Sequence, residues 1–292
     1  MDAIPRWFRG VRLNFAENVL FSRDADGTRG TRGKEDAKLA LTEVREGGTE
    51  LRDVSWGALR ARVGRLASAL RAHGLRRGDR VAVVASNSSD TLCVFLAATA
   101  LGGLFSSSST DMGARGVLDR LTQIEPAFVF VDDAALYNGR RVDLRARMRE
   151  LVDGLAAAGA RGFRAVVSMP RWSAPADVSA VPRAVTMRDF LRAATTEALQ
   201  FERVDFSDPF LIVYSSGTTG TPKCIVHCVG GILVSAAKEN KIHRDFGPDT
   251  VALQYTTVNT YPHAPFHPCK SFRLLVQAAA AAERLQTRSS TT

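Results

Sequence analysis

The chain has 292 residues, 45% hydrophobic and 24% charged, which excludes collagen-like, disulfide-rich and wholly disordered proteins. The formal net charge is +9, but the basic residues are spread along the sequence, so we expect no nucleic-acid partner. Four irregularly spaced cysteines favour a reducing, cytoplasmic location over a disulfide framework. The most apolar stretch, 92–105, is shorter than the ~20 residues that span a bilayer, so no membrane span is expected.

Predicted helices and strands alternate through the first part of the chain. The first clear helix starts after Ser55, a suitable N-cap, and ends before Gly74. A buried strand is predicted over 81–85, followed by a helix over 91–101 that Ser88, Ser89 or Asp90 can cap. The elements predicted next are a helix over 117–124, a strand over 127–131, a helix over 144–158 and a strand over 164–168. This order predicts an α/β fold with mostly parallel strands flanked by helices.

The segments between these elements suggest how the chain is divided. Segment 23–38 is charged and reads as a surface loop, and the proline-rich segment 170–182 reads as a connector. Asp132 and Asp133, at the end of a strand, read as a solvated turn. We expect an N-terminal α/β subdomain over 1–200, the start of a second α/β subdomain over 201–258 and a divergent, disordered tail over 259–292.

The most informative segment follows a strand predicted over 210–214. Nine residues, 215–223, supply five hydroxyl groups, two glycines, a proline and a lysine. The residues expected to contact phosphate are Ser215, Ser216, Gly217, Thr218, Thr219, Gly220, Thr221 and Lys223. Small residues let backbone N–H groups approach an oxyanion closely, and a lysine adds a point charge that suits phosphate. We name 215–223 the phosphate loop, and expect it at the carboxyl end of its strand, where open α/β sheets bind ligands.

Two alternatives for this loop are weaker. A linker rich in Ser, Thr and Gly would not be expected to join a buried strand directly and end in Pro-Lys. The P-loop of nucleoside triphosphatases requires a second glycine five positions after its first, followed by lysine and then Ser or Thr. Here Pro222 lies five positions after Gly217, and Cys224 follows the lysine.

The motif YSSGTTGTPK, 214–223, resembles the phosphate-loop signature of adenylate-forming enzymes. Other segments narrow the resemblance to acetoacetyl-CoA synthetases, or acetoacetate–CoA ligases, over roughly residues 4–258. These segments are WFRGVRLNFAENVL at 7–20, VSWGALRARVGRLASALRAHGLRRGDRVA at 54–82, FSSSSTDMGARGVLDRLTQIEP at 105–126 and YNGR at 137–140.

The resemblance implies a two-step ligase reaction of lipid metabolism. A small carboxylate, acetoacetate foremost, attacks the α-phosphate of ATP with Mg²⁺ assisting, and CoA thiolate then displaces AMP from the acyl-adenylate. The phosphate loop would bind ATP through Ser215 to Thr221 and Lys223. Gly139 and Arg140 match the position where short-chain relatives hold CoA, although an ordinary exposed arginine is an equally good reading of Arg140.

The sequence departs from the resemblance after Val258, where a tryptophan-rich stretch would be expected and a proline-rich one follows. We therefore expect an N-terminal portion of the enzyme, with no assigned catalytic residue and without the C-terminal catalytic region that completes the reaction. The alternative from another class is a nucleotide-binding or regulatory fragment without turnover. The sequence leaves the oligomeric state open.

No metal site is predicted. His263, His267 and Cys269 lie close together in sequence, as do Cys224, His227 and Cys228. Neither group has the paired spacing of a structural zinc site, so we interpret both as chance clusters.

Overall fold

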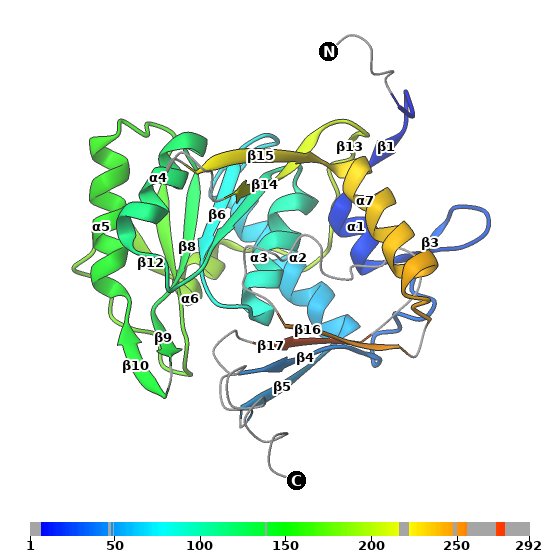
Figure 1. Ribbon diagram of the computed structural model, residues 1–292, viewed down its shortest axis with the longest axis horizontal. Coiled ribbons are helices and arrows are strands. Elements are labelled where there is room, and N and C mark those ends of the chain that lie inside the picture. The colour runs from blue at the N-terminus through cyan, green and yellow to red at the C-terminus, as the bar shows by residue number, and fades with distance from the viewer. Residues whose placement is uncertain are drawn as a thin grey trace.

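A seven-stranded sheet forms the centre of the computed structural model, which describes residues 7–45, 48, 50–137, 139–215, 222–247, 250–255 and 273–277 (Figure 1). Its strand order is β12-β11-β8-β6-β7-β14-β15. The strands are β6 (Arg80–Val84), β7 (Leu104–Ser108), β8 (Phe128–Asp132), β11 (Ala165–Met169), β12 (Ala184–Thr186), β14 (Pro209–Ser215) and β15 (Lys223–Cys228). All neighbouring strands are parallel except β14 and β15. The predicted α/β class with a mostly parallel sheet is confirmed.

Helices cover both faces of this sheet, with α2 (Trp56–Ala72) and α3 (Ser89–Ala100) on one and α4 (Ala114–Ile124) and α5 (Arg145–Ala157) on the other. Successive side chains of a strand point to opposite faces. In β6, Val81 and Val83 therefore pack with α2 and α3, while Ala82 and Val84 pack with α4 and α5. Burial on both sides explains why this strand is apolar at every one of these positions.

The predicted ends of the first two long helices agree with the structure. Ser55 is the N-cap of α2, where its hydroxyl accepts a hydrogen bond from the Ala58 N–H at 3.2 Å. Gly74 follows α2 with φ +85°, a left-handed conformation that glycine adopts without strain. Of the three candidate caps for α3, Ser88 is the N-cap, and its hydroxyl accepts from the Thr91 N–H at 3.1 Å.

A second sheet, ordered β16-β17-β4-β5, lies below the first in Figure 1. Its strands are β4 (Leu39–Val44), β5 (Leu51–Ser55), β16 (Val251–Tyr255) and β17 (Arg273–Gln277). β17 is parallel to both β16 and β4, whereas β4 and β5 are antiparallel. The five residues of β17 form a strand, although they fall within the tail expected to be disordered. The rest of 259–292 lies outside the described residues.

Strands β14 and β15 belong to the same sheet as β6, β7 and β8, because β14 pairs with β7 in parallel. The register places Leu211 opposite Phe105 and Ile212 opposite Ser106. The segment expected to open a second subdomain thus extends the first sheet, and the boundaries at 200 and 258 stay a prediction. Helix α7 (Val229–Lys238) and a π-helical turn, η2 (Glu239–His243), follow the hairpin.

The charged segment 23–38 is more than the expected surface loop. It contributes part of a short antiparallel pair, β2 (Ser22–Arg23) with β3 (Arg29–Gly30), and contains Lys34, which is completely buried. The Lys34 ammonium donates to carbonyls of 19 and 21 at 2.7 and 2.9 Å, at the end of α1 (Phe15–Leu20). Backbone carbonyls left unpaired at a helix C-terminus attract a cation, which is why this lysine folds inward.

The remaining elements are short. They are β1 (Arg12–Leu13), β9 (Ala134–Tyr137), β10 (Arg140–Asp143), α6 (Met187–Phe190), η1 (Leu191–Ala193) and β13 (Val204–Asp205). Strands β9 and β10 pair with each other as an antiparallel hairpin, and β1 pairs with β13.

Candidate functional site

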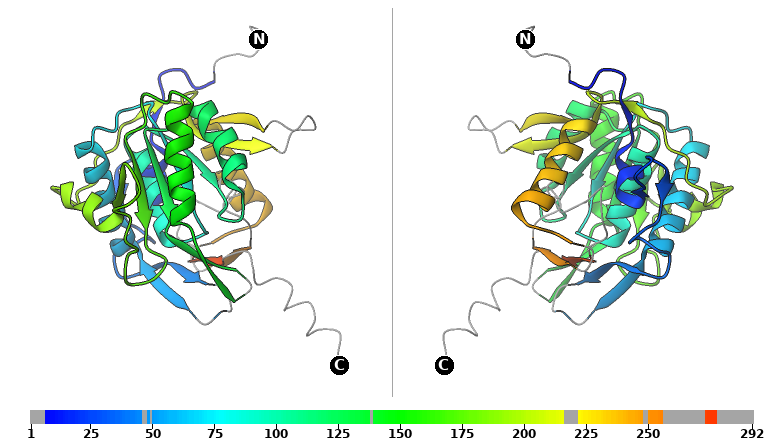
Figure 2. Two further views of the ribbon diagram at one scale, coloured as in Figure 1. Left: turned by 90° about the vertical axis from the view of Figure 1, so that its left-hand side faces the viewer. Right: turned by 90° about the vertical axis from the view of Figure 1, so that its right-hand side faces the viewer.

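The predicted phosphate loop connects the two strands of the β14–β15 hairpin. Ser215 ends β14, Lys223 begins β15, and the two residues are paired across the hairpin. Ser215 is half-buried and Lys223 is exposed. Figure 2 shows the hairpin projecting from the rest of the molecule. Ser216, Gly217, Thr218, Thr219, Gly220 and Thr221 lie outside the described residues, so their contacts with phosphate stay a prediction.

Helix α4 holds the hairpin on both sides of the loop. The Tyr214 hydroxyl donates to the Arg120 carbonyl at 2.8 Å, and the Gln123 side-chain amide donates to the Pro222 carbonyl at 3.2 Å. The Arg120 guanidinium also lies 5.5 Å from the centre of the Tyr214 ring. Burial, with a further contribution from Cys224, raises the pKa of Tyr214 above its usual range, so its hydroxyl stays a neutral donor. Residues on either side of the loop are therefore fixed to one helix.

The predicted CoA contacts lie on a different hairpin. Gly139, between β9 and β10, has φ +73° and no atom within 4 Å of the position a Cβ would take. Arg140 is exposed and pairs with Tyr137 across the hairpin. Figures 1 and 2 show the β9–β10 hairpin well apart from the β14–β15 hairpin. The structure thus places both predicted groups on hairpins that extend from the central sheet, but does not bring them together.

Polar side chains that the sequence analysis did not select gather where β6 and β8 end. Asp132 and Asp133 are only 5% and 4% exposed, so the expectation of a solvated turn is wrong. Asp132 accepts hydrogen bonds from the Ser86 N–H and hydroxyl, both at 2.8 Å. Asp133 accepts from the backbone N–H groups of Arg171 and Ala176 at 2.8 and 3.0 Å. Both carboxylates turn inward because backbone donors at the ends of neighbouring segments meet them there.

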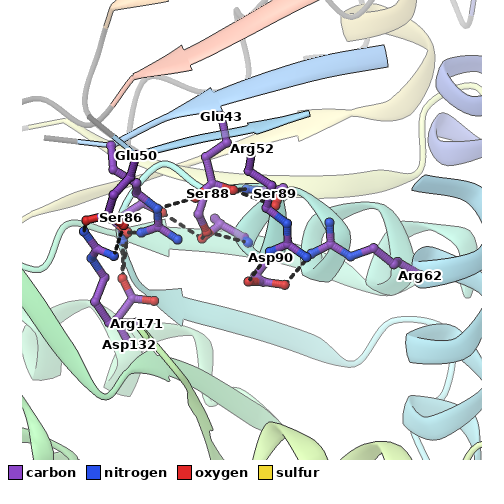
Figure 3. Close-up of polar contacts among 12 residues, drawn as sticks. Glu43, Glu50, Arg52, Arg62, Ser86, Ser88, Ser89, Asp90, Asp132 and Arg171 are labelled. Carbon is purple, nitrogen blue, oxygen red and sulfur yellow. Dashed lines mark hydrogen bonds and ion pairs between the residues drawn. The ribbon is translucent and has the colours of Figure 1, made fainter. Parts of the chain in front are cut away.

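The same region binds the small sheet to the large one through Glu43 of β4, which is 2% exposed (Figure 3). Its carboxylate accepts from the Ser89 N–H and hydroxyl at 3.0 and 2.6 Å and forms an ion pair with Arg45. The N-terminus of a helix favours an anion, and here the protein supplies one itself. Arg45 in turn donates to the Ser86 hydroxyl at 3.2 Å. We name Glu43, Arg45, Ser86, Ser89 and Asp132 the edge cluster.

The electrostatics of the edge cluster follow from its burial. Burial raises the pKa of Asp132 to about 6, and the two hydrogen bonds from Ser86 and the charge of Arg45 only partly offset this effect. The sequence contained one sign of this cluster: three consecutive residues, 88–90, could each cap α3, but a helix has only one N-cap residue. The partner of Ser89 is Glu43, which lies 46 positions away, so no local pattern predicts their contact.

Neither a metal site nor a membrane-spanning helix occurs within the part of the chain that the structure describes. There, no three His, Cys, Asp or Glu side chains come together in a way that could hold a metal ion. Cys224 is exposed and Cys228 half-buried, whereas His263, His267 and Cys269 lie outside this part of the chain. Within the same residues, no helix combines the length and the apolar character needed to cross a membrane.

Comparison with known proteins decides the family. The sequence model of the family described as "AMP-binding enzyme" matches residues 31–260 of this chain. This range includes the β14–β15 hairpin and the strands of both sheets up to β16. The chain belongs to the AMP-binding enzyme family. This agrees with the resemblance to adenylate-forming enzymes found in the phosphate loop.

Individual relatives narrow the similarity. An acetoacetyl-CoA synthetase of Macaca fascicularis is 39% identical over 259 residues, 87% of this chain and 36% of the relative. A malonamoyl-CoA synthetase of Penicillium aethiopicum is 37% identical over 246 residues, 84% of this chain and 33% of the relative. The solved structure of an acetoacetyl-CoA synthetase from Streptomyces lividans matches with a TM-score of 0.79 and 33% identity, covering 94% of this chain and 40% of that one.

These comparisons confirm the predicted similarity to acetoacetyl-CoA synthetases and the fold that it implied. The chain spans about a third of the length of the curated relatives it matches. What the complete relatives do is therefore a basis for proposals about this chain.

Proposed function

We propose that this chain binds ATP through the phosphate loop, and that it provides the nucleotide site of an acyl-CoA ligase that activates acetoacetate. One observation carries the proposal: the residues on either side of the loop, Tyr214 and Pro222, are both fixed to α4 in a family whose members bind adenine nucleotides. A loop whose ends are fixed loses less conformational entropy when it closes around a ligand.

The chemistry of the proposal requires charge stabilisation at the loop. A carboxylate has a poor leaving oxygen. When that oxygen attacks the α-phosphate of ATP, pyrophosphate is released and the oxygen becomes part of an acyl-adenylate, from which it can depart with AMP. Negative charge builds on the pyrophosphate as it leaves, and backbone N–H groups together with Lys223 would stabilise it. CoA thiolate would then form the thioester and release AMP.

The resemblance implies CoA and Mg²⁺ in addition to ATP. CoA is proposed as the second substrate, with Gly139 and Arg140 as contacts on the exposed β9–β10 hairpin. For Mg²⁺, the described residues offer no group of three His, Cys, Asp or Glu side chains that could hold the ion.

The test separates nucleotide binding from turnover. ATP binding is measured by calorimetry and by protection of the loop from proteolysis, and turnover by ATP–pyrophosphate exchange with acetoacetate, malonamate and acetate. We expect binding and protection, with exchange far below that of a complete acetoacetyl-CoA synthetase, as predicted from the sequence. Exchange at the rate of a complete synthetase would contradict the second expectation, and absence of both binding and protection would overturn the proposal.

A matched pair of lysine variants sharpens the test. Lys223→Gln removes the exposed charge at the end of the loop, and we expect ATP binding to weaken about tenfold. Lys238→Gln removes an exposed charge at the end of α7, where Lys238 pairs with Glu239, and should leave ATP binding unchanged. Equal effects of both changes would mean that Lys223 acts only through net charge.

A further inference from the structure

A pocket of about 500 Å³ lies between the small sheet and the segment that follows β11. Its lining includes Glu43, Arg45, Glu50, Arg52, Arg171 and Trp172. Arg171 and Trp172 come directly after the carboxyl end of β11, the edge of an open α/β sheet where ligands bind. None of the lining residues belongs to either hairpin, although Arg141 of β10 contacts the pocket's Trp172.

Arg171 is the most deeply buried arginine among the lining residues, and its partner is Glu50. Its side chain is 4% exposed and forms two hydrogen bonds with the Glu50 carboxylate, at 2.9 and 3.0 Å (Figure 3). The backbone N–H of Arg171 donates to Asp133, which holds the residue in place. A guanidinium fixed in this way presents two parallel donors, the arrangement that recognises a carboxylate or a phosphate.

Glu50 pairs with the Arg171 guanidinium but is itself exposed to solvent. The Glu50 side chain is 47% exposed, whereas the arginine it pairs with is almost fully enclosed. The other lining carboxylates are engaged elsewhere, because Glu43 accepts from the Ser89 N–H at the start of α3 and Asp90 pairs with Arg62. Glu50 is therefore the carboxylate best placed to exchange with an anion from solvent.

Trp172 adds an apolar, aromatic surface next to the charge. The guanidinium groups of Arg171 and Arg141 lie 5.1 and 4.5 Å from the centre of its ring. Arg45 and Arg52 also line the pocket, and each forms an ion pair with another carboxylate of the lining, Glu43 and Asp90 respectively. An anion with a flat or apolar body would find both a receptor for its charge and a surface for its body here.

We propose that this pocket is a binding site for a small organic anion, a carboxylate or phosphate monoester with an aromatic or apolar body, and that Glu50 is its displaceable internal occupant. The incoming anion takes the two donors of Arg171, Glu50 turns to solvent, and the body of the ligand lies against Trp172. The contact between Arg171 and Glu50 thereby sets the affinity, since every ligand must compete with it.

The experiment uses phenyl phosphate as the probe on the full chain. Binding is followed by calorimetry and by tryptophan fluorescence, with Trp172→Phe identifying the part of the signal that comes from this pocket. Glu50→Gln removes the competing charge, and we expect phenyl phosphate to bind about tenfold more tightly. The matched control is Asp153→Asn, since Asp153 is also an exposed carboxylate paired with an arginine, Arg149, on α5. It should bind as the unchanged protein does.

Removing the receptor tests the proposal from the other side. Arg171→Leu should lower phenyl phosphate binding at least tenfold and also abolish the gain from Glu50→Gln. Arg171→Lys, which keeps the charge but not the two parallel donors, should recover only part of the binding and guards against a folding defect. Equal affinity of the Glu50 and Asp153 variants would overturn the proposal. So would loss of binding in Lys223→Gln together with normal binding in Arg171→Leu, because the probe would then occupy the phosphate loop.

Discussion

The β14–β15 hairpin and the edge cluster both hold polar groups at the ends of sheet strands, yet they are assembled in different ways. In the hairpin, the residues predicted to contact phosphate follow one another in sequence, and α4 supports them from either side. In the edge cluster, Glu43 from the small sheet meets Ser89 at the start of α3, while Asp132 of β8 meets Ser86. The hairpin projects from the body, and the edge cluster is buried within it.

This difference suggests two separate tasks. A projecting hairpin with exposed Lys223 can meet a ligand at little cost in desolvation. Burying a charge costs desolvation free energy unless the charge is fully paired. The charges of the edge cluster are paired with each other and with hydrogen-bond donors, and these contacts hold the small sheet against the large one. We therefore expect substitutions in the edge cluster to change stability most, and substitutions near the loop to change ligand binding more than stability.

The largest effect is expected for Glu43→Gln. The change leaves the mostly buried Arg45 without its partner charge and removes the negative charge at the start of α3. We therefore expect a loss of about 3–5 kcal/mol in the free energy of unfolding. Urea denaturation followed by circular dichroism measures it. Asp153→Asn, in an exposed pair, should lose less than about 1 kcal/mol. Similar losses in the two variants would show that burial does not distinguish the edge cluster from a surface pair.

The next effect concerns pH and Asp132. Its pKa is about 6 in the folded chain and near the ordinary value of about 4 when unfolded, so the folded state holds this proton more tightly. The stability that Asp132 contributes is full below about pH 4 and is lost as the pH rises through about 6. Asp132→Asn can still accept both hydrogen bonds from Ser86 but does not titrate.

The measurement for Asp132 compares the free energies of unfolding of the unchanged chain and Asp132→Asn over this pH range. We expect the free energy of unfolding of Asp132→Asn, relative to the unchanged chain, to rise by about 2–3 kcal/mol between pH 4 and pH 7. Taking the difference removes the contribution of carboxylates such as Glu17, whose pKa is lowered by Arg203 and other arginines although burial opposes it. A difference that does not change with pH would show that Asp132 titrates normally.

The smallest effect on stability is expected for Tyr214→Phe. The change removes one hydrogen bond, from the Tyr214 hydroxyl to the Arg120 carbonyl, and should lower the free energy of unfolding by about 1 kcal/mol. Thermal unfolding measures this, and proteolysis with and without ATP measures whether the loop is still protected. Tyr137→Phe, an exposed tyrosine on β9, should change neither. If Tyr137→Phe and Tyr214→Phe behave alike, α4 does not hold the hairpin in the way argued above.

Much of the fold could be predicted because its signals are local. Apolar runs such as 81–85 must be buried on both sides, and Ser55, Ser88 and Gly74 carry the backbone chemistry of helix ends. The phosphate-loop motif is also a continuous segment. In contrast, the buried state of Lys34, Asp132 and Asp133 depends on donors and acceptors from other parts of the chain. Local sequence predicts only that such charged residues are solvated.

The sequence by itself determined the α/β class, the positions of the main helices and strands, and the similarity to acetoacetyl-CoA synthetases. Each of these depends on residues that are near neighbours in the chain. Tertiary structure alone decided that Glu43 would serve as the anion at the start of α3, and that Glu50 would meet Arg171. Ser89 lies 46 positions from Glu43 and Arg171 lies 121 positions from Glu50, and only the packing of the small sheet against the strand ends brings these partners into contact.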